Sequence, residues 1–332
     1  MKKILKVFKT LFLTCIILAF VVSMSIFVYH KYQLSEESEL IKSKETLVEI
    51  NDRKINVYSE GKGKDTYVFM AGSGIAAPLY EMKGLYSKFS KEHKIAVVER
   101  AGYGYSNVSH DKRDIDTILE QTRESLILSG NKPPYILVPH SLSGLEAIYW
   151  AQKYPEEVKG IIALDIGLPE EYANYEMSLA DSFTIRGMNV LTRIGFHRLF
   201  PSATYDPEVV RQSFLTVQEK EVFKAISYKQ AFNNDMKQEL LQNNKNAKKS
   251  VKLPIPVETP ILFLSAYTDE NKNATYTKQK VENYKQLADQ LETAEVKEVK
   301  GRHSIYLYAP EEIYNLSVNF INEKVENDER PK

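Results

Sequence analysis

The N-terminal part of the chain consists of a long apolar run with a polar segment on each side. An apolar run from about Leu11 to Tyr29, with its flanks, reaches the roughly 20 residues that a helix needs to cross a hydrocarbon layer. The segment after this run is acidic around residues 36–39, whereas the segment before it is basic. Because the more basic flank of a span stays inside the cell, we expect a single-pass anchor with its N-terminus inside and the rest of the chain outside. The basic residues are Lys2, Lys3, Lys6 and Lys9.

A cleaved signal peptide is the alternative interpretation of this segment. Signal peptides have an apolar region of about 7–15 residues that ends at small residues. Ser23 and Ser25 could serve as such residues, but the apolar run continues beyond them to Tyr29. The pattern therefore favours an uncleaved transmembrane anchor over residues 10–30, preceded by a basic cytoplasmic segment (1–9) and followed by a polar spacer (31–44).

From about Glu45 onward, short continuous apolar runs alternate with stretches of helical periodicity. Continuous runs of this length are typical of strands buried in a parallel sheet. Helical spacing of apolar residues occurs at 115–126, at 281–291 and after Pro310. This alternation predicts an α/β protein with a mostly parallel sheet flanked by helices. The expected strands include Tyr67–Met70, Ile95–Val98, Tyr135–Val138, Ile161–Leu164, Ile261–Leu264 and Glu295–Val299.

The alternation stops between residues 168 and 257, a stretch with many scattered aromatic residues. We expect this stretch to be a helical cap that covers one end of the sheet, inserted into a core formed by 45–167 and 258–326. Such a density of aromatic residues suits an apolar lid over an acyl-binding pocket, although most of them would pack between lid and core.

Composition limits the chemistry that the chain can perform. The 44 lysines and arginines balance the 44 aspartates and glutamates, so the long-range field that nucleic-acid binding usually needs is absent and no nucleic-acid partner is expected. Cys15 is the single cysteine, which excludes an internal disulfide and multi-cysteine metal clusters. Catalysis must therefore use oxygen and imidazole groups.

Ser141 lies in the segment that most strongly suggests chemistry. The expected strand at 135–138 runs through Pro139, His140, Ser141 and Leu142 into small residues at 143 and 144 and then a helix. A strand that turns sharply into a helix at a serine flanked by small residues is the pattern of a nucleophile elbow. The usual glycines are replaced here by Pro139 and Ser143, and a serine that only caps the helix is the alternative.

Two further segments occur in the order and spacing of the α/β-hydrolase family, which the chain resembles from about Tyr67 to Asn322. Residues 70–74 (Met-Ala-Gly-Ser-Gly) resemble the oxyanion loop of that family, with Ala71 where many members have histidine. Residues 99–106 (Glu-Arg-Ala-Gly-Tyr-Gly-Tyr-Ser) resemble its acidic-Arg-x-Gly-x-Gly-x-Ser segment. The resemblance implies an α/β-hydrolase fold with a helical cap after the sixth strand, and it names no substrate.

A serine nucleophile requires a base and an orienting acid. Of the six histidines, His303 follows the last expected strand and precedes the last helix, where the family places its base. His140 is adjacent to Ser141 in sequence and is expected to point away from it. For the acid we expect Asp269, in the loop after the 261–264 strand, with Asp165 at the end of the 161–164 strand as the alternative.

The oxyanion hole should be formed by the backbone N–H of Leu142 and that of Ser73 or Gly74. No phosphate-binding loop or complete dinucleotide motif is present, and the histidines lack metal-ligand spacing, so neither cofactor nor metal is expected. These residues predict a serine hydrolase that cleaves an ester, in preference to an amide, of a small-molecule or lipid-like acyl substrate. The alternatives are an inactive hydrolase-like binding module, to which Pro139 and Ala71 point, and an acyltransferase or perhydrolase using the same residues.

Overall fold

The computed structural model describes residues 2–42, 47–109 and 112–325. The expected boundary between spacer and core, at residues 44 and 45, and the expected end of the core at residue 326 lie outside the described residues.

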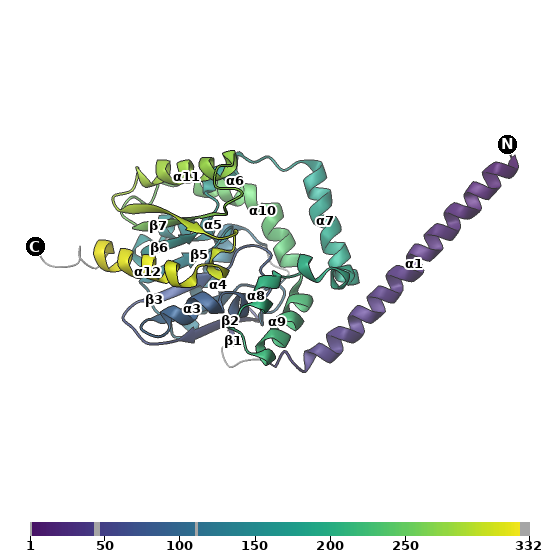
Figure 1. Ribbon diagram of the computed structural model, residues 1–332, viewed down its shortest axis with the longest axis horizontal. Coiled ribbons are helices and arrows are strands. Elements are labelled where there is room, and N and C mark those ends of the chain that lie inside the picture. Colours follow the sequence, from purple (N-terminus) through teal and green to yellow (C-terminus); the bar gives the residue numbers. More distant parts are fainter. Residues whose placement is uncertain (1, 43–46, 110–111, 326–332) are drawn as a thin grey trace, which may run out of the picture.

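A single eight-stranded sheet forms the centre of the molecule, in the order β1-β2-β4-β3-β5-β6-β7-β8 (Figure 1). The strands from β3 to β8 pair in parallel, while β2 pairs antiparallel with both β1 and β4. The six strands expected from the sequence lie within β3 to β8, so the predicted mostly parallel α/β architecture is confirmed. The strand bounds are β1 Leu47–Ile50, β2 Arg53–Glu60, β3 Thr66–Met70, β4 Lys94–Glu99, β5 Tyr135–Pro139, β6 Val158–Leu164, β7 Ile261–Tyr267 and β8 Ala294–Lys300.

Helices cover both faces of this sheet. Successive strand residues point to opposite faces, so continuous apolar strands present an apolar surface on each side that helices bury. Phe69 of β3 belongs to an apolar cluster with helices α3 and α12, whereas the adjacent Val68 belongs to a cluster with α4, α5 and α11. Both side chains are fully buried, which is typical of a parallel strand covered on two sides. The helices are α2 Pro78–Glu81, α3 Lys83–Phe89, α4 Ile115–Leu128, α5 Ser143–Lys153, α11 Thr275–Ala288 and α12 Pro310–Phe320.

Five α-helices lie between β6 and β7, in the region where the sequence predicted a helical cap. Helix α10 packs back against α6 and α5 and so joins this region to the core, while α7 extends along its outer side (Figure 1). The bounds are α6 Pro169–Asn174, α7 Leu179–Ile194, α8 Pro207–Arg211, α9 Val217–Gln230 and α10 Asn234–Ser250. We call residues 168–257 the cap.

Helix α1 (Lys2–Ser38) projects from the cap as one long rod (Figure 1). Within the described residues it is the one helix long and apolar enough to cross a membrane, with a mean hydropathy of 2.8 in an apolar window of which no residue is buried in the molecule. Both a membrane anchor and a signal sequence meet this criterion. The expected spacer is largely helical, because α1 continues to Ser38 and is held there by two hydrogen bonds of 2.7 and 2.6 Å from Arg198 to Glu37.

Candidate active site

Ser141 occupies a sharp turn between β5 and α5. Its φ of +56° lies in the left-handed region that a non-glycine residue seldom adopts. The turn is compact, since a Cβ on Gly144 would lie 2.5 Å from Ile166 and a Cβ on Gly72 would lie 2.8 Å from the Cβ of Ser141. Glycine is therefore required at both positions, on either side of the serine, and the local geometry is that of a nucleophile elbow.

The imidazole of His303 connects Ser141 to a buried carboxylate. The Nε2 atom of His303 lies 2.8 Å from Oγ of Ser141, and its Nδ1 atom lies 2.6 Å from Oδ2 of Asp165. The backbone N–H of Ala266 donates to Oδ1 of Asp165 at 2.7 Å, and Lys280 also donates to this oxygen. Burial alone would raise the pKa of Asp165, but the hydrogen bonds from His303, Lys280 and Ala266 outweigh it and hold the pKa below its ordinary value.

The structure places Asp269 away from His303, which corrects the expected pairing. Strand β7 continues to Tyr267 and pairs there with Lys300 of β8, so Asp269 lies in a loop beyond the edge of the sheet. Its side chain is 74% exposed and forms an ion pair of 2.6 Å with Lys300. Asp165, the alternative weighed from the sequence, directly follows β6 and is 4% exposed. The imidazole contact therefore comes from Asp165.

His140 does not point away from the site, contrary to the expectation from the sequence. Its ring centroid lies 4.6 Å from that of His303, and its Nε2 atom lies 3.1 Å from the backbone oxygen of His303. Because a carbonyl oxygen only accepts, this nitrogen carries the proton. Complete burial lowers the pKa of His140 to about 3, so the ring is neutral. His140 holds the loop that carries His303, a role that adjacency to Ser141 did not reveal.

The expected oxyanion donors lie beside Ser141. Among the described residues, the backbone N–H groups of Leu142 and Ser73 have no protein acceptor within hydrogen-bond distance. The loop that carries Ser73 is fixed by a hydrogen bond of 2.8 Å from Arg100 to the backbone oxygen of Ala71. The two amides are thus available to an anionic oxygen on the substrate side of the serine.

Ser141 and His303 open into a cavity of about 720 Å³ between the core and the cap. Its lining includes the acidic residues Glu81 and Asp206 and the basic residue Arg302. Burial raises the pKa of Glu81 to about 7, although Tyr306 donates a hydrogen bond of 2.8 Å to it. The cavity is therefore more polar than the apolar acyl pocket expected from the aromatic residues of the cap.

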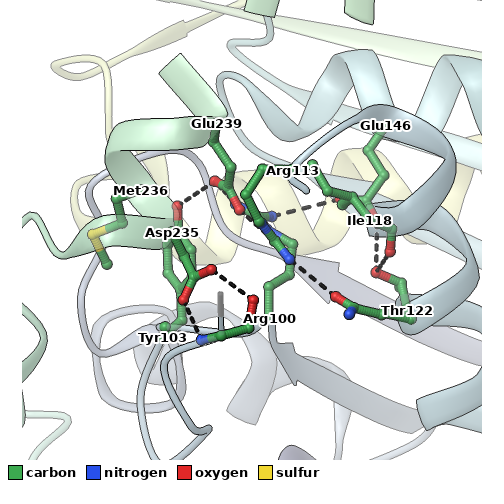
Figure 2. Close-up of polar contacts among 12 residues, drawn as sticks. Arg100, Tyr103, Arg113, Ile118, Thr122, Glu146, Asp235, Met236 and Glu239 are labelled. Atoms are coloured by element: carbon green, nitrogen blue, oxygen red, sulfur yellow. Dashed lines mark hydrogen bonds and ion pairs between the residues drawn. The ribbon is translucent and has the colours of Figure 1, made fainter. Parts of the chain in front are cut away.

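Behind the nucleophile turn lies a buried ionic cluster, which we define as Arg100, Arg113, Glu146, Asp235 and Glu239 (Figure 2). Glu239 of α10 pairs with Arg113 at 2.6 Å and with Arg100 at 3.3 Å. Arg100 also lies 3.6 Å from Glu146 of α5. The cluster therefore joins the cap helix α10 to the core segment that holds the oxyanion loop.

Several residues around this cluster complete its hydrogen bonds. Tyr103 donates to Glu239 at 2.7 Å, Thr122 donates to Glu146 at 2.6 Å, and Asp235 accepts from both the backbone N–H and the hydroxyl of Ser109. Sequence reasoning missed the cluster. The partners of Glu239 and Asp235 lie more than a hundred positions away in the chain, and no local spacing pairs them.

Comparison with solved structures defines the class of this fold. A membrane phospholipase A, described as a novel bacterial virulence factor, matches with a TM-score of 0.60 over 98% of this chain and 100% of its own, at 17% identity. An epoxide hydrolase mutant from Vigna radiata matches with a TM-score of 0.62 over 83% of this chain and 98% of its own, at 16% identity. The chain has the α/β-hydrolase fold.

Comparison with other sequences then places the chain in a particular family. The uncharacterized protein YbdG of Bacillus subtilis (strain 168) is 60% identical over 321 residues, which cover 97% of this chain and 99% of YbdG. The chain belongs to the same family as YbdG. No family model matches the sequence.

Proposed function

We propose that this protein is a membrane-anchored serine hydrolase that cleaves a carboxylic ester, in preference to an amide, through an acyl-enzyme intermediate. The observation that carries the proposal is the hydrogen-bonded chain from Ser141 through His303 to Asp165, with distances of 2.8 and 2.6 Å, at the floor of an open cavity. Nucleophile, base and orienting acid in one such chain activate a serine hydroxyl for attack on a carbonyl carbon.

The reaction follows from these positions. Oγ of Ser141 attacks the carbonyl carbon while Nε2 of His303 accepts the hydroxyl proton, and Asp165 orients the imidazole and offsets its charge. The N–H groups of Leu142 and Ser73 stabilise the oxyanion of the tetrahedral intermediate. His303 returns the proton to the leaving group, and a water molecule activated by the same imidazole then releases the acid from Ser141.

The substrate is a small-molecule or lipid-like acyl compound with a polar part. Lipid-like substrates are supported by the structural neighbour described as a membrane phospholipase A and by the apolar helix α1. The acidic residues Glu81 and Asp206 in the cavity lining favour a substrate that presents hydrogen-bond donors there. With α1 as an anchor whose basic end stays inside, the catalytic domain lies on the outer face of the cell membrane.

A fluorophosphonate probe tests this proposal without knowledge of the substrate, because it captures an activated serine covalently. We expect the full-length protein in detergent to be labelled at Ser141, and the variants Ser141→Ala and His303→Ala to remain unlabelled. If the folded wild-type protein is not labelled, the proposal fails and the inactive binding module takes its place. Product analysis with an added alcohol acceptor distinguishes hydrolysis from acyl transfer.

A further inference from the structure

Helix α1 contacts the cap along one of its faces, at the end of its apolar run. Phe27, His30, Lys31 and Leu34 follow the i, i+3, i+4, i+7 spacing of one helix face and line a groove of about 500 Å³ between α1 and the cap. The contact is close and specific at His30, whose Nδ1 accepts a hydrogen bond of 2.8 Å from Arg198. The groove is therefore formed by a defined contact between α1 and the cap.

Three basic residues from three different elements line this groove: Lys31 of α1, Arg193 of α7 and Lys229 of α9. Within the described residues, none of the three has an acidic partner, in contrast to Arg198, which pairs with Glu37. Partial burial lowers the pKa of Lys229, and no carboxylate opposes this effect. Three cations without a counter-charge make the groove complementary to an anion.

Apolar side chains line another part of the groove, beside the polar residues Thr192 and Asn233. The apolar lining comes from Phe27 and Leu34 of α1 and from Val190 and Ile194 of α7. The apolar surface continues outward along α7, where Leu179 and Phe183 are 81% and 73% exposed. Basic and apolar surfaces that adjoin in this way match the two parts of a phospholipid, its phosphate and its acyl chains.

The position of the groove along α1 agrees with that of lipid headgroups. The apolar run ends at Tyr29, and the groove residues of α1 extend to Leu34, which is roughly 7 Å farther along the helix at 1.5 Å per residue. The headgroup layer on each side of a bilayer is about 5–8 Å thick. A helix that spans the hydrocarbon layer up to Tyr29 therefore places the groove at the level of the lipid phosphates.

We propose that the groove between α1 and the cap binds the headgroup of an anionic phospholipid, with Lys31, Arg193 and Lys229 around the phosphate and the acyl chains against Phe27 and α7. This site is separate from the cavity at Ser141. The inference rests on the part of the proposed function that makes α1 a membrane anchor, and it does not depend on the hydrolytic reaction.

The test uses the full-length protein in a neutral detergent, titrated with phosphatidylglycerol or phosphatidylcholine and followed by native mass spectrometry. We expect the wild type to bind one phosphatidylglycerol in preference to phosphatidylcholine. In Arg193→Gln/Lys229→Gln, affinity for phosphatidylglycerol should fall about thirtyfold, equivalent to about 2 kcal/mol, because each basic residue near a lipid surface contributes about 1 kcal/mol. Inorganic phosphate at the same concentration should not displace the lipid, because it lacks the acyl chains.

The matched control is Arg186→Gln/Lys220→Gln, which removes the same charge from the same two helices outside the groove. This variant should retain the preference for phosphatidylglycerol, and so should the charge-preserving variant Arg193→Lys/Lys229→Arg. Equal binding of both lipids by the wild type, or an equal loss in the control, would overturn the inference. Fluorophosphonate labelling of the same samples reports on Ser141 independently, so failure of the lipid site and failure of the proposed reaction are distinguishable.

Discussion

The two sides of the nucleophile turn satisfy their polar groups in opposite ways. On the cavity side, the N–H groups of Ser73 and Leu142 have no acceptor in the part of the chain that the structure describes, and the side chain of His303 is 56% exposed. On the other side, both oxygens of Glu239 are engaged by Arg113, Arg100 and Tyr103, all of them buried. The comparison shows that the groups open to the cavity are positioned by a second set of polar groups that is buried and hydrogen-bonded. We therefore expect changes on the cavity side to affect rate and changes behind the turn to affect stability.

The largest effect on the cavity side is expected for Ser141→Ala. The substitution removes one hydroxyl from a compact turn, so the fold should persist while turnover of a short activated ester falls by about a million-fold. Ester hydrolysis and thermal unfolding, measured on the same preparation, check this outcome. Turnover above a tenth of the wild-type rate in pure protein would exclude Ser141 as the nucleophile.

Asp165→Asn should cost less, on the order of ten-thousand-fold in kcat, because the amide stabilises the wrong tautomer of His303. Asp269→Asn is the matched control and should leave turnover near that of the wild type, since the exposed side chain of Asp269 pairs with Lys300 at the surface. Steady-state kinetics on both variants decide between the two acids. A dead Asp269→Asn together with an active Asp165→Asn would contradict the geometry described above.

Glu239→Gln should produce the main effect behind the turn. Loss of this carboxylate leaves Arg113 and Arg100 with less counter-charge in a buried site, and breaking such a pair costs about 3–5 kcal/mol of unfolding free energy. Urea unfolding measures the loss of stability. The control is Glu311→Gln, which removes one partner of the exposed ion pair with Lys88. Its unfolding midpoint should stay close to that of the wild type. In Glu239→Gln, turnover per labelled Ser141 should fall far less than in Asp165→Asn. An equal fall in turnover would contradict the expectation that changes behind the turn affect stability and not rate.

The smallest expected effect, counted for each unit of pH, is the pH dependence of stability contributed by His140. Its pKa is about 3 in the folded protein and near 6.5 when unfolded, so the unfolded state binds a proton that the folded state does not. Stability from this group is complete above pH 6.5 and is lost as pH falls toward 3, by up to about 1.4 kcal/mol per pH unit. Unfolding midpoints of the wild type and His140→Asn between pH 4 and 7 test this. Parallel curves would show that His140 is not held neutral by the fold.

The parts of the fold that follow from local pattern were predictable. Runs such as Tyr67–Met70 are continuous and apolar because both faces of their strands are covered, and the turn at Ser141 is marked by its small neighbours. The choice between Asp165 and Asp269 was not predictable, because it depends on how far β7 extends past its apolar run, a property set by pairing with β8. The partners of Glu239 were equally hidden, since an isolated glutamate on an amphipathic helix carries no sign of burial.

The unbroken course of α1 has a mechanical consequence. A helix that ends in a flexible tether would leave the catalytic domain free to tumble above the membrane, whereas this rod is clamped to the cap through Arg198 and Glu37. With α1 as the anchor, its tilt sets both the height of the cavity mouth above the bilayer and the direction in which it faces. Because the tilt of a membrane helix adjusts to the thickness of the hydrocarbon layer, a thinner or thicker membrane would rotate the catalytic domain together with α1.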